Sequence, residues 1–293
     1  IRPLVIGRLG NSYVLASETC ALDMVGAEFL REVDNGEVVV ITDDGLESHR
    51  PFPIRPARPC IFEYIYFARP DSLVGGQTVY DIRKRMGIEL AREAPTGADV
   101  IVPIPDSGVP AAIGFSQQSG IPFELGIIRN HYIGRTFIEP EQRIRQLGVK
   151  LKHSANSGVI RGNRVVLIDD SVVRGTTSKK IVQLIRDAGA AEVHMRISSP
   201  PITHPDFYGI DTPSKKDLLA ANMSLEEMRD FMGADSLAFL SVDGIYRAIG
   251  LDHRDDRAPQ FTDHCFTGDY PTNLTDYGGE AVPRQLSLLA EVG

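Results

Sequence analysis

The chain has 293 residues, of which 42% are apolar and 24% charged, with a formal net charge of −8 and a pI near 5.4. This length and apolar content support a substantial core, more than one average domain requires. The acidic balance argues against nucleic acid as a partner. Because the sequence has neither a run of eighteen apolar residues nor a signal segment, we expect no membrane partner and a cytoplasmic location.

The N-terminal part of the chain shows two features of local structure. Residues 36–42, followed by Asp43-Asp44-Gly45, predict a strand and a tight turn at the edge of a sheet. Residues 51–59 contain four prolines, which is typical of a linker. Cys20 follows a β-like run and is interpreted as a half-buried structural thiol. The three cysteines are widely spaced, which suits a reducing compartment.

A strand that ends on a tight turn comes next. An amphipathic helix over residues 79–94 precedes a buried strand over residues 98–105. The strand ends on Pro105-Asp106-Ser107-Gly108, and a helix of small residues follows over 109–118. Taken alone, this tetrapeptide is a common type I turn.

The most informative stretch is a second strand, which ends on two acids. Residues 165–168 are apolar and three of the four are β-branched, as in a buried parallel strand. Asp169 and Asp170 therefore lie at its carboxyl end, where open α/β sheets bind ligands. A helix follows over residues 178–188. The turn before it is rich in hydroxyl groups and contains Ser171, Arg174, Gly175, Thr176 and Thr177. Backbone N–H groups at a helix start suit a phosphate, and paired carboxylates suit ribose hydroxyls or Mg²⁺. The stretch therefore predicts a site for a phosphorylated sugar.

A cationic segment lies between the two turns. Residues 129–152 carry six arginines and lysines against two glutamates, in a chain that is acidic as a whole. One interpretation is a solvated surface loop. The other is a lid that closes over a polyphosphate, neutralises its charge and excludes water. On the second interpretation, the cations that act are Arg135, Lys150 and Lys152.

Strands and helices alternate between residues 98 and 199, which predicts an α/β fold with a parallel sheet. Two helix starts follow. One is at Thr212-Pro213, with proline in the first helical position, and one is at Ser224, where Glu227 completes a capping box. Residues 278–293 are rich in glycine and then weakly amphipathic, which leaves a tail and a subunit contact as alternatives.

The strand, the acid pair and the Gly-Thr-Thr turn of residues 165–177 resemble the 5-phosphoribosyl 1-pyrophosphate (PRPP) motif of type I phosphoribosyltransferases. Other segments look like the glutamine PRPP amidotransferases, the family that opens de novo purine synthesis. These segments are residues 13–20, 62–72, 134–138, 197–202 and 265–268. The resemblance covers nearly the whole chain except its C-terminal end.

The resemblance implies two domains. Residues 1–57 correspond to the last part of a glutaminase domain of the Ntn-hydrolase (α+β) type, and residues 58–293 to a phosphoribosyltransferase domain with a parallel sheet. The family's glutaminase uses a cysteine at the mature N-terminus, whereas this sequence begins with Ile1. We therefore expect a fragment that lacks most of the glutaminase, including its nucleophile, and that has no glutaminase activity.

The resemblance also implies roles for the residues of the two turns. Ser107 and Gly108 would form the pyrophosphate loop, and Ser107, Asp169 and Asp170 would hold Mg²⁺. PRPP would bind to these residues and to Ser171, Arg174, Gly175, Thr176 and Thr177. The residues expected to act in catalysis are Asp169, Asp170, Arg135, Lys150 and Lys152.

A branch of this family holds a [4Fe–4S] cluster on four cysteines. Cys60 and Cys265 fall at two of these positions, but Asp206 and Thr262 stand at the other two. Because such clusters normally require four thiolates, we expect none here. Zn²⁺ on Cys60, Cys265, Asp206 and His204 is conceivable, although no spacing signature supports it. Two reduced structural thiols are the preferred interpretation.

The implied reaction transfers ammonia, taken from glutamine in the intact enzyme, to PRPP and gives 5-phosphoribosylamine and pyrophosphate. One alternative is a PRPP-binding regulator without catalysis, which usually adds a basic DNA-binding element that the sequence does not show. Another is a salvage transferase that acts on nucleobases. The other implied partners are purine nucleotide inhibitors, the missing N-terminal glutaminase portion and further copies of the chain in a homotetramer.

Overall fold

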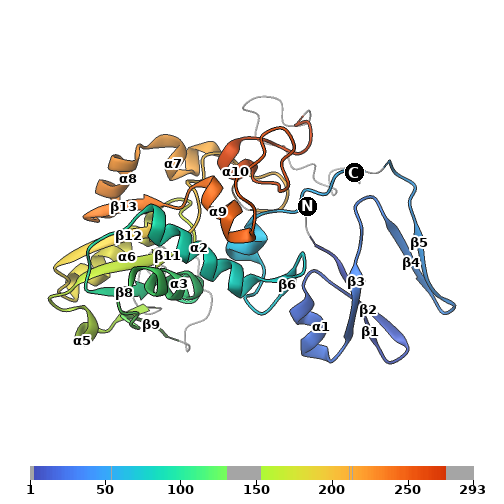
Figure 1. Cartoon of the computed structure of the whole chain (residues 1–293), viewed down its shortest axis with the longest axis horizontal. Coiled ribbons are helices and arrows are strands. Elements are labelled where there is room, and N and C mark those ends of the chain that lie inside the picture. Colours follow the sequence, from blue (N-terminus) through green and yellow to red (C-terminus); the bar gives the residue numbers. More distant parts are fainter. Residues whose placement is uncertain (1–2, 54, 131–152, 211, 213, 275–293) are drawn as a thin grey trace, which may run out of the picture.

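The computed structural model describes residues 3–53, 55–130, 153–210, 212 and 214–274. The chain forms two parts that lie side by side in Figure 1. The N-terminal module (residues 3–49) contains strands and one helix, and the α/β domain (residues 60–274) contains the larger sheet. The described part of the proline-rich segment between them, residues 50–59, has no helix or strand, as expected for a linker.

Three antiparallel strands and one helix form the body of the N-terminal module. The elements are β1 (Val5–Leu9), β2 (Ser12–Ala16), α1 (Thr19–Val25) and β3 (Glu28–Glu32). The strands pair in the order β2-β1-β3. Val5, Leu22 and Ala27 make a small apolar core between the sheet and α1.

The predicted strand and turn near residue 43 form a separate hairpin. β4 (Val38–Thr42) and β5 (Gly45–His49) pair antiparallel on either side of Asp43-Asp44. The turn is confirmed, but the expectation of a sheet edge is wrong, because the hairpin is a two-stranded sheet of its own. Before β4, the Glu37 carboxylate accepts hydrogen bonds from the Arg31 guanidinium (2.6 and 2.9 Å) and the Asp34 N–H (2.7 Å). These bonds hold a turn that leads the chain away from the first sheet.

The α/β domain is built on a parallel sheet of four strands, as predicted. The strands are β8 (Val100–Pro103), β11 (Arg164–Asp169), β12 (Glu192–Ile197) and β13 (Ser236–Phe239), and they pair in the order β13-β12-β11-β8. Val166 and Ile168 of β11 belong to one apolar core cluster, and Val165 and Leu167 belong to another. Both faces of the sheet are therefore covered, which explains why its strands are continuous apolar runs.

Helices cover the two faces of this sheet in two groups (Figure 1). One face carries α2 (Val79–Glu93), α3 (Val109–Ser119) and α9 (Val242–Ile249), and the other carries α6 (Thr176–Asp187) and α8 (Leu225–Met232). The ends of α2, α3 and α6 agree with the predicted ranges to within two residues. No helix within the described ranges combines the length and the apolar character that a membrane span needs.

Shorter elements connect these layers. They are η1 (Glu63–Phe67, a π-helix), β6 (Leu73–Val74), β7 (Gln77–Thr78), β9 (Ile127–Arg129), β10 (His153–Ala155), α5 (Ser157–Ile160), η3 (Lys215–Asp217, a 3₁₀-helix), α7 (Leu219–Asn222) and α10 (His264–Thr267). β9 and β10 pair antiparallel and flank residues 131–152.

The two predicted helix starts have different outcomes. The capping box is confirmed at the start of α8, where Ser224 Oγ accepts a hydrogen bond from the Glu227 N–H (3.2 Å) and the Glu227 carboxylate accepts one from the Ser224 N–H (2.8 Å). The start at Thr212-Pro213 is wrong, since the next helical residues are those of η3. Thr212 instead binds Asp206, whose N–H lies 3.1 Å from the threonine hydroxyl and 3.2 Å from its carbonyl oxygen.

The N-terminal module contacts the α/β domain through the residue before α1. Glu18 Oε2 accepts hydrogen bonds from the Arg69 N–H (2.7 Å) and the Ser72 hydroxyl (2.8 Å) of the α/β domain. The Cys20 thiol lies 3.7 Å from the same oxygen. Cys20 is buried and not disulfide-bonded, and burial raises the pKa of its thiol, which disfavours the nucleophilic thiolate.

Helices α2 and α3 approach each other so closely that their contact admits only glycine. A Cβ atom on Gly87 of α2 would overlap the carbonyl oxygen of Ala111 in α3. A Cβ atom on Gly114 of α3 would overlap the carbonyl oxygen of Lys84 in α2. The spacing of these helices sets the position of α3, which begins just after the Ser107-Gly108 turn.

We expect Gly114→Ala to destabilise the protein by about 1–3 kcal/mol, because the added methyl group must push α2 away. The measurement is the free energy of unfolding in urea. Gly158→Ala is the matched control, since its Cβ would meet only Asn156 Oδ1 at 3.4 Å, and we expect a change within about 0.5 kcal/mol. Equal stability of the two variants would contradict the close helix contact.

Candidate functional site

The two turns identified from the sequence meet at the carboxyl edge of the parallel sheet, after β8 and β11. The Ile104 N–H donates a hydrogen bond to the carbonyl oxygen of Ile168 (2.8 Å), so the chain after β8 stays paired with the end of β11. A Cβ on Gly108 would overlap that same Ile168 oxygen. The Ser107 hydroxyl lies near the Asp170 carboxylate, where it lowers the pKa of Asp170. The structure thus places the Ser107-Gly108 turn directly against the acid pair.

The turn after the acid pair opens helix α6. Gly175 occupies the N-cap position with φ of 68°, a left-handed conformation that favours glycine. A Cβ there would lie 2.6 Å from Leu219 Cδ2 of α7. Thr176 and Thr177 form the first exposed turn of α6, so their N–H groups and hydroxyls can face a bound anion. Arg174 is exposed and pairs with Asp217 at 3.3 Å.

The two carboxylates are buried next to each other and repel. Burial raises the pKa of Asp169 well above its ordinary value, and the charge of Asp170 adds to this shift. Burial also raises the pKa of Asp170, while hydrogen bonds from Ser107 and Ser171 and the charge of Arg83 pull it down. The Ser171 hydroxyl lies 2.5 Å from Asp170 Oδ1. The pair is therefore poised to accept positive charge.

Arg83 of α2 is a member of this site that sequence reasoning missed. Its guanidinium is buried and donates hydrogen bonds to the carbonyl oxygens of Tyr64 (2.8 Å) and Ala68 (2.7 Å) around η1. Burial lowers the pKa of Arg83, and the charge of Asp170 opposes that shift. An arginine inside an amphipathic helix gives no sequence signal of burial, because the pattern alone would place it on the solvated face.

The donor set at the edge of the sheet fits Mg²⁺. The side chains of Asp169, Asp170 and Ser107 offer carboxylate and hydroxyl oxygens, which are the ligands that Mg²⁺ prefers. The repulsion within the acid pair is also what a divalent cation relieves. The expected roles of these residues in holding Mg²⁺ and PRPP stay predictions.

The expected lid residues Arg135, Lys150 and Lys152 lie outside the described residues. The described ends of that segment, β9 and β10, form the base of an antiparallel hairpin. Arg129, the last residue of β9, forms an ion pair with Asp106 of the Ser107-Gly108 turn. The hairpin base is therefore anchored beside the turn that the sequence assigns to diphosphate.

The positions assigned to an iron–sulfur cluster do not fit one. Cys60 and Thr262 pair through their backbones. Asp206, however, lies beside His264 and Cys265. A [4Fe–4S] cluster needs four thiolates, and these positions supply only two. His204, the other residue considered for zinc, hydrogen-bonds instead to Thr203 Oγ1 at 2.9 Å.

A cavity lies elsewhere, at the boundary of the N-terminal module. It has a volume of about 470 Å³ and is lined by Glu32, Arg50, Glu63 and Tyr64, among others. None of the acid-pair or turn residues lines it. We therefore place the candidate site at the sheet edge on the basis of its chemistry rather than of cavity size.

Comparison with known families identifies the class of the larger domain. A family model described as a phosphoribosyl transferase domain matches residues 71–198, a range that contains both turns. The α/β domain therefore has the phosphoribosyltransferase fold, and the predicted α/β fold class is confirmed.

Almost the whole chain is similar to amidophosphoribosyltransferases. It is 60% identical to the enzyme of that name from Rhizobium etli over 100% of this chain and 60% of the relative. It is 53% identical to the one from Bacillus subtilis over 94% of this chain and 57% of the relative. A solved structure of the B. subtilis glutamine PRPP amidotransferase, complexed with ADP and GMP, matches with a TM-score of 0.86 and 51% identity, covering 96% of this chain and 61% of that one. The chain thus spans 57–60% of the length of these two curated relatives.

We expect Asp169→Asn to stabilise the ligand-free protein by roughly 1–2 kcal/mol near neutral pH, because it removes one of two buried, repelling charges. The folded-state pKa of Asp169 is raised, so the native state holds its proton longer than the unfolded chain does. Stability is therefore lost as the pH rises from about 4 through the folded-state pKa, and the variant avoids that loss.

The measurement is thermal unfolding across this pH range, with and without Mg²⁺ and PRPP. Exposed Asp187→Asn serves as the control for loss of one negative charge. Mg²⁺ with PRPP should raise the Tm of the wild type and of the control but not of Asp169→Asn. A ligand-free Asp169→Asn protein that is less stable than the wild type at neutral pH would refute the repulsion.

Proposed function

We propose that this chain is the phosphoribosyltransferase portion of an amidophosphoribosyltransferase, which transfers ammonia to PRPP. The observation that carries the proposal is the close approach of the Ser107-Gly108 turn to the acid pair at one edge of the sheet. PRPP bears a phosphate and a diphosphate at opposite ends of its ribose, so its site needs two such turns. The identity to amidophosphoribosyltransferases over almost the whole chain supports the same assignment.

Each turn takes one end of the substrate in this proposal. The start of α6, from Gly175 to Thr177, holds the 5-phosphate through backbone N–H groups and hydroxyls. The Ser107-Gly108 turn holds the diphosphate. Asp169 and Asp170 accept hydrogen bonds from the ribose hydroxyls and fix the ring between the two turns.

The reaction needs no protein nucleophile. The nitrogen lone pair of ammonia forms a bond to the anomeric carbon while the bond from that carbon to the diphosphate oxygen breaks. Pyrophosphate leaves with the bonding electrons, and the new amine releases one proton. Asp169, Asp170 and Ser107 would hold Mg²⁺, which would neutralise negative charge on the diphosphate.

The protein's own contribution is positioning and electrostatic stabilisation of the leaving group. We propose that Arg135, Lys150 and Lys152 close over the diphosphate. The ion pair between Arg129 and Asp106 supports this, because it ties the base of that segment to the diphosphate turn. Closure would also exclude water, which otherwise competes with ammonia.

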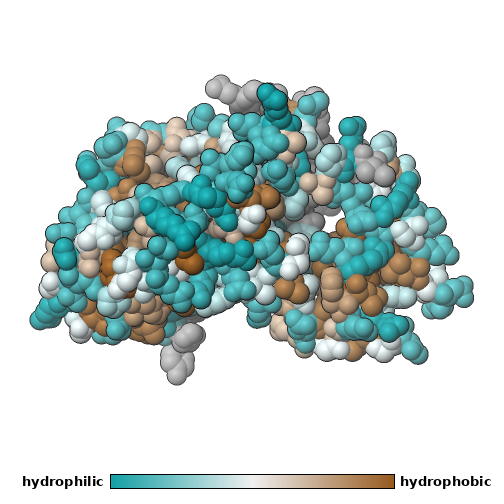
Figure 2. Space-filling model, viewed as in Figure 1, coloured by the Kyte–Doolittle hydropathy of each residue, from teal (hydrophilic) through white to brown (hydrophobic). Residues whose placement is uncertain are grey.

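The N-terminal module supports a second part of the proposal, namely that residues 1–57 end a glutaminase domain of the Ntn-hydrolase type. Its surface is rich in apolar side chains, visible as brown areas over β1 to β3 and α1 in Figure 2. The exposed ones include Leu9, Leu15, Met24, Val25 and Phe29. Because the relatives are longer, we propose that further glutaminase polypeptide covers this face and supplies ammonia from glutamine. Without that further polypeptide, the transferase would use free ammonia.

We also propose regulation by purine nucleotides and a cytoplasmic homotetramer. The related B. subtilis structure contains ADP and GMP. Each of these nucleotides carries a 5-phosphorylated ribose, the same group that the α6 turn would hold in PRPP. A nucleotide at this turn would therefore compete with PRPP.

The test is a steady-state assay of pyrophosphate release from PRPP with Mg²⁺ and ammonium. We expect ammonia-dependent turnover, no turnover with glutamine alone, and a loss of roughly 100-fold or more in kcat for Asp170→Asn. Lys152→Ala should lose activity as well, whereas the exposed control Asp187→Asn should keep it. Pyrophosphate release that requires a nucleobase, or PRPP binding without any turnover, would contradict the proposal.

A further inference from the structure

Three side chains that can bind a metal ion meet outside the phosphoribosyl site. Asp206, His264 and Cys265 place one donor atom each within 4.8 Å of the others. His264 Nε2 lies 2.8 Å from Asp206 Oδ1 and 3.5 Å from Cys265 Sγ. The side chains of Asp206 and His264 are 0% and 1% exposed. We refer to these residues as the Asp–His–Cys cluster.

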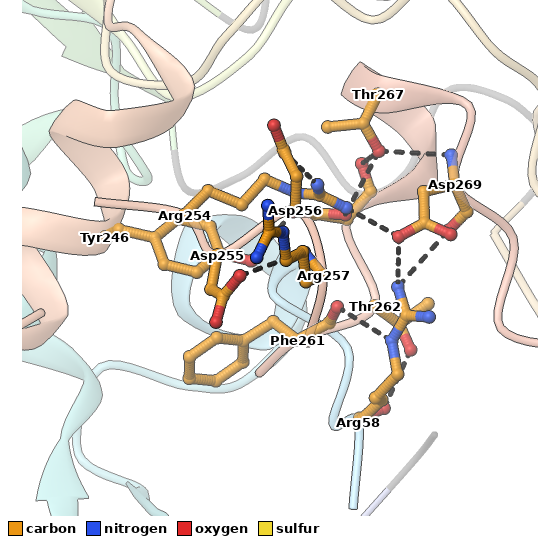
Figure 3. Close-up of polar contacts among 11 residues, drawn as sticks. Arg58, Tyr246, Arg254, Asp255, Asp256, Arg257, Phe261, Thr262, Thr267 and Asp269 are labelled. Carbon is orange, nitrogen blue, oxygen red and sulfur yellow. Dashed lines mark hydrogen bonds and ion pairs between the residues drawn. The ribbon is translucent and has the colours of Figure 1, made fainter. Parts of the chain in front are cut away.

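A buried ionic network holds the segment that carries two of these donors. The Asp263 carboxylate, at the residue before α10, accepts hydrogen bonds from the Tyr246 hydroxyl (2.8 Å) and Arg254 Nε (2.7 Å). Arg254 also binds Asp269 (2.6 Å), which in turn binds Arg58 of the linker (3.0 Å), as Figure 3 shows. Helix α10 is therefore held at both ends, by Asp263 before it and Asp269 after it, and the two donors that it carries are held in place.

Asp206 directs one oxygen to the backbone and the other to the cluster. Its Oδ2 accepts hydrogen bonds from the N–H groups of Tyr208 (2.9 Å) and Ile210 (2.6 Å). Its Oδ1 is buried and has no partner with hydrogen-bond geometry among the described residues, although His264 Nε2 is close. An ordinary ion pair would direct an N–H at this oxygen. Asp206 Oδ1 and His264 Nε2 are thus in direct contact in a buried place, and a cation bound between them would replace this contact.

Two tyrosine rings pack against the His264 ring. The ring centroids of Tyr270 and Tyr208 lie 4.8 and 5.2 Å from its own. Its Nδ1 atom is buried and has no hydrogen-bond partner in the described parts of the chain. Among the described residues, the polar contacts of His264 therefore lie on its Nε2 side, toward Asp206 and Cys265.

We propose that Asp206, His264 and Cys265 bind a single divalent transition-metal ion, and that zinc is the ion of choice. Zinc accepts this combination of carboxylate oxygen, imidazole nitrogen and thiolate sulfur. An iron–sulfur cluster does not suit this donor set, because it requires four thiolates. These three ligands are separate from the residues of the acid pair that fit Mg²⁺, and they take no part in the proposed ammonia transfer.

The distances are close to those of a tetrahedral zinc site. With bonds of about 2.0–2.3 Å, ligand nitrogen and sulfur lie roughly 3.5 Å apart, and nitrogen and oxygen roughly 3.3 Å apart. The observed distance of 3.5 Å from His264 Nε2 to Cys265 Sγ already fits. The Asp206 oxygen, at 2.8 Å from the nitrogen, would move by about 0.5 Å.

The ion would act as a structural cross-link. Asp206 lies in the loop after β12, and the other two ligands begin α10, so a shared ion joins segments that are distant in the sequence. Binding of an ion to the native state alone also stabilises that state. We therefore expect removal of the ion to lower the Tm without abolishing PRPP binding at the sheet edge.

The test measures the metal content of the purified protein and the spectrum of its Co²⁺-substituted form. We expect about one zinc per chain, and a thiolate-to-Co²⁺ charge-transfer band that the carboxylate site for Mg²⁺ cannot give, since it has no thiol. His264→Ala and Cys265→Ser should lose the zinc and the band. Cys20→Ser, which removes a buried thiol elsewhere, should keep both.

Two results would overturn the proposal. One is a wild-type protein that keeps no stoichiometric zinc or Co²⁺ after dialysis and whose Tm does not change when either ion is added. That result would mean that Asp206 and His264 form an ion pair without a metal. The other is iron bound together with inorganic sulfide. Because the wild-type protein gives the spectrum and the Tm response, the test stands even where a variant fails to fold.

Discussion

The structure of the candidate site depends on the parallel pairing of β8 with β11. This pairing brings two chain segments, more than fifty residues apart in the sequence, to the same edge of the sheet. The hydrogen bond from the Ile104 N–H to the Ile168 oxygen continues the pairing past the end of β8. Gly108 packs on that same oxygen, where no side chain fits. Ser107 can therefore reach Asp170, and a single substrate can contact both turns.

A cost in stability accompanies this arrangement. Two carboxylates are buried side by side, and the nearby cation is Arg83, which is itself held by the backbone around η1. The contact from Glu18 to Ser72 links the N-terminal module to the loop that follows η1. The charge of Arg83 lowers the pKa of Asp170, while its guanidinium binds the backbone around η1, beside the loop that contacts the N-terminal module.

Much of this architecture could be predicted from the sequence, because it rests on local patterns. Apolar runs predicted strands β8 and β11, and the capping box at Ser224 predicted the start of a helix. The acid pair and the Gly-Thr-Thr turn predicted the position of the site. What could not be predicted depends on tertiary contacts. Arg83 is buried inside an amphipathic helix, Thr212 binds Asp206 instead of starting a helix, and His264 joins Asp206 across a long loop.

The most direct test of the central claim is a double-mutant cycle on PRPP binding. Calorimetry would give the affinity of the wild type, Ser107→Ala, Asp170→Asn and the double variant for PRPP with Mg²⁺. If the two turns form one site, the two single losses should not add, with a coupling energy of about 1 kcal/mol or more. Additive losses would mean that Ser107 and Asp170 act independently, and would contradict the account.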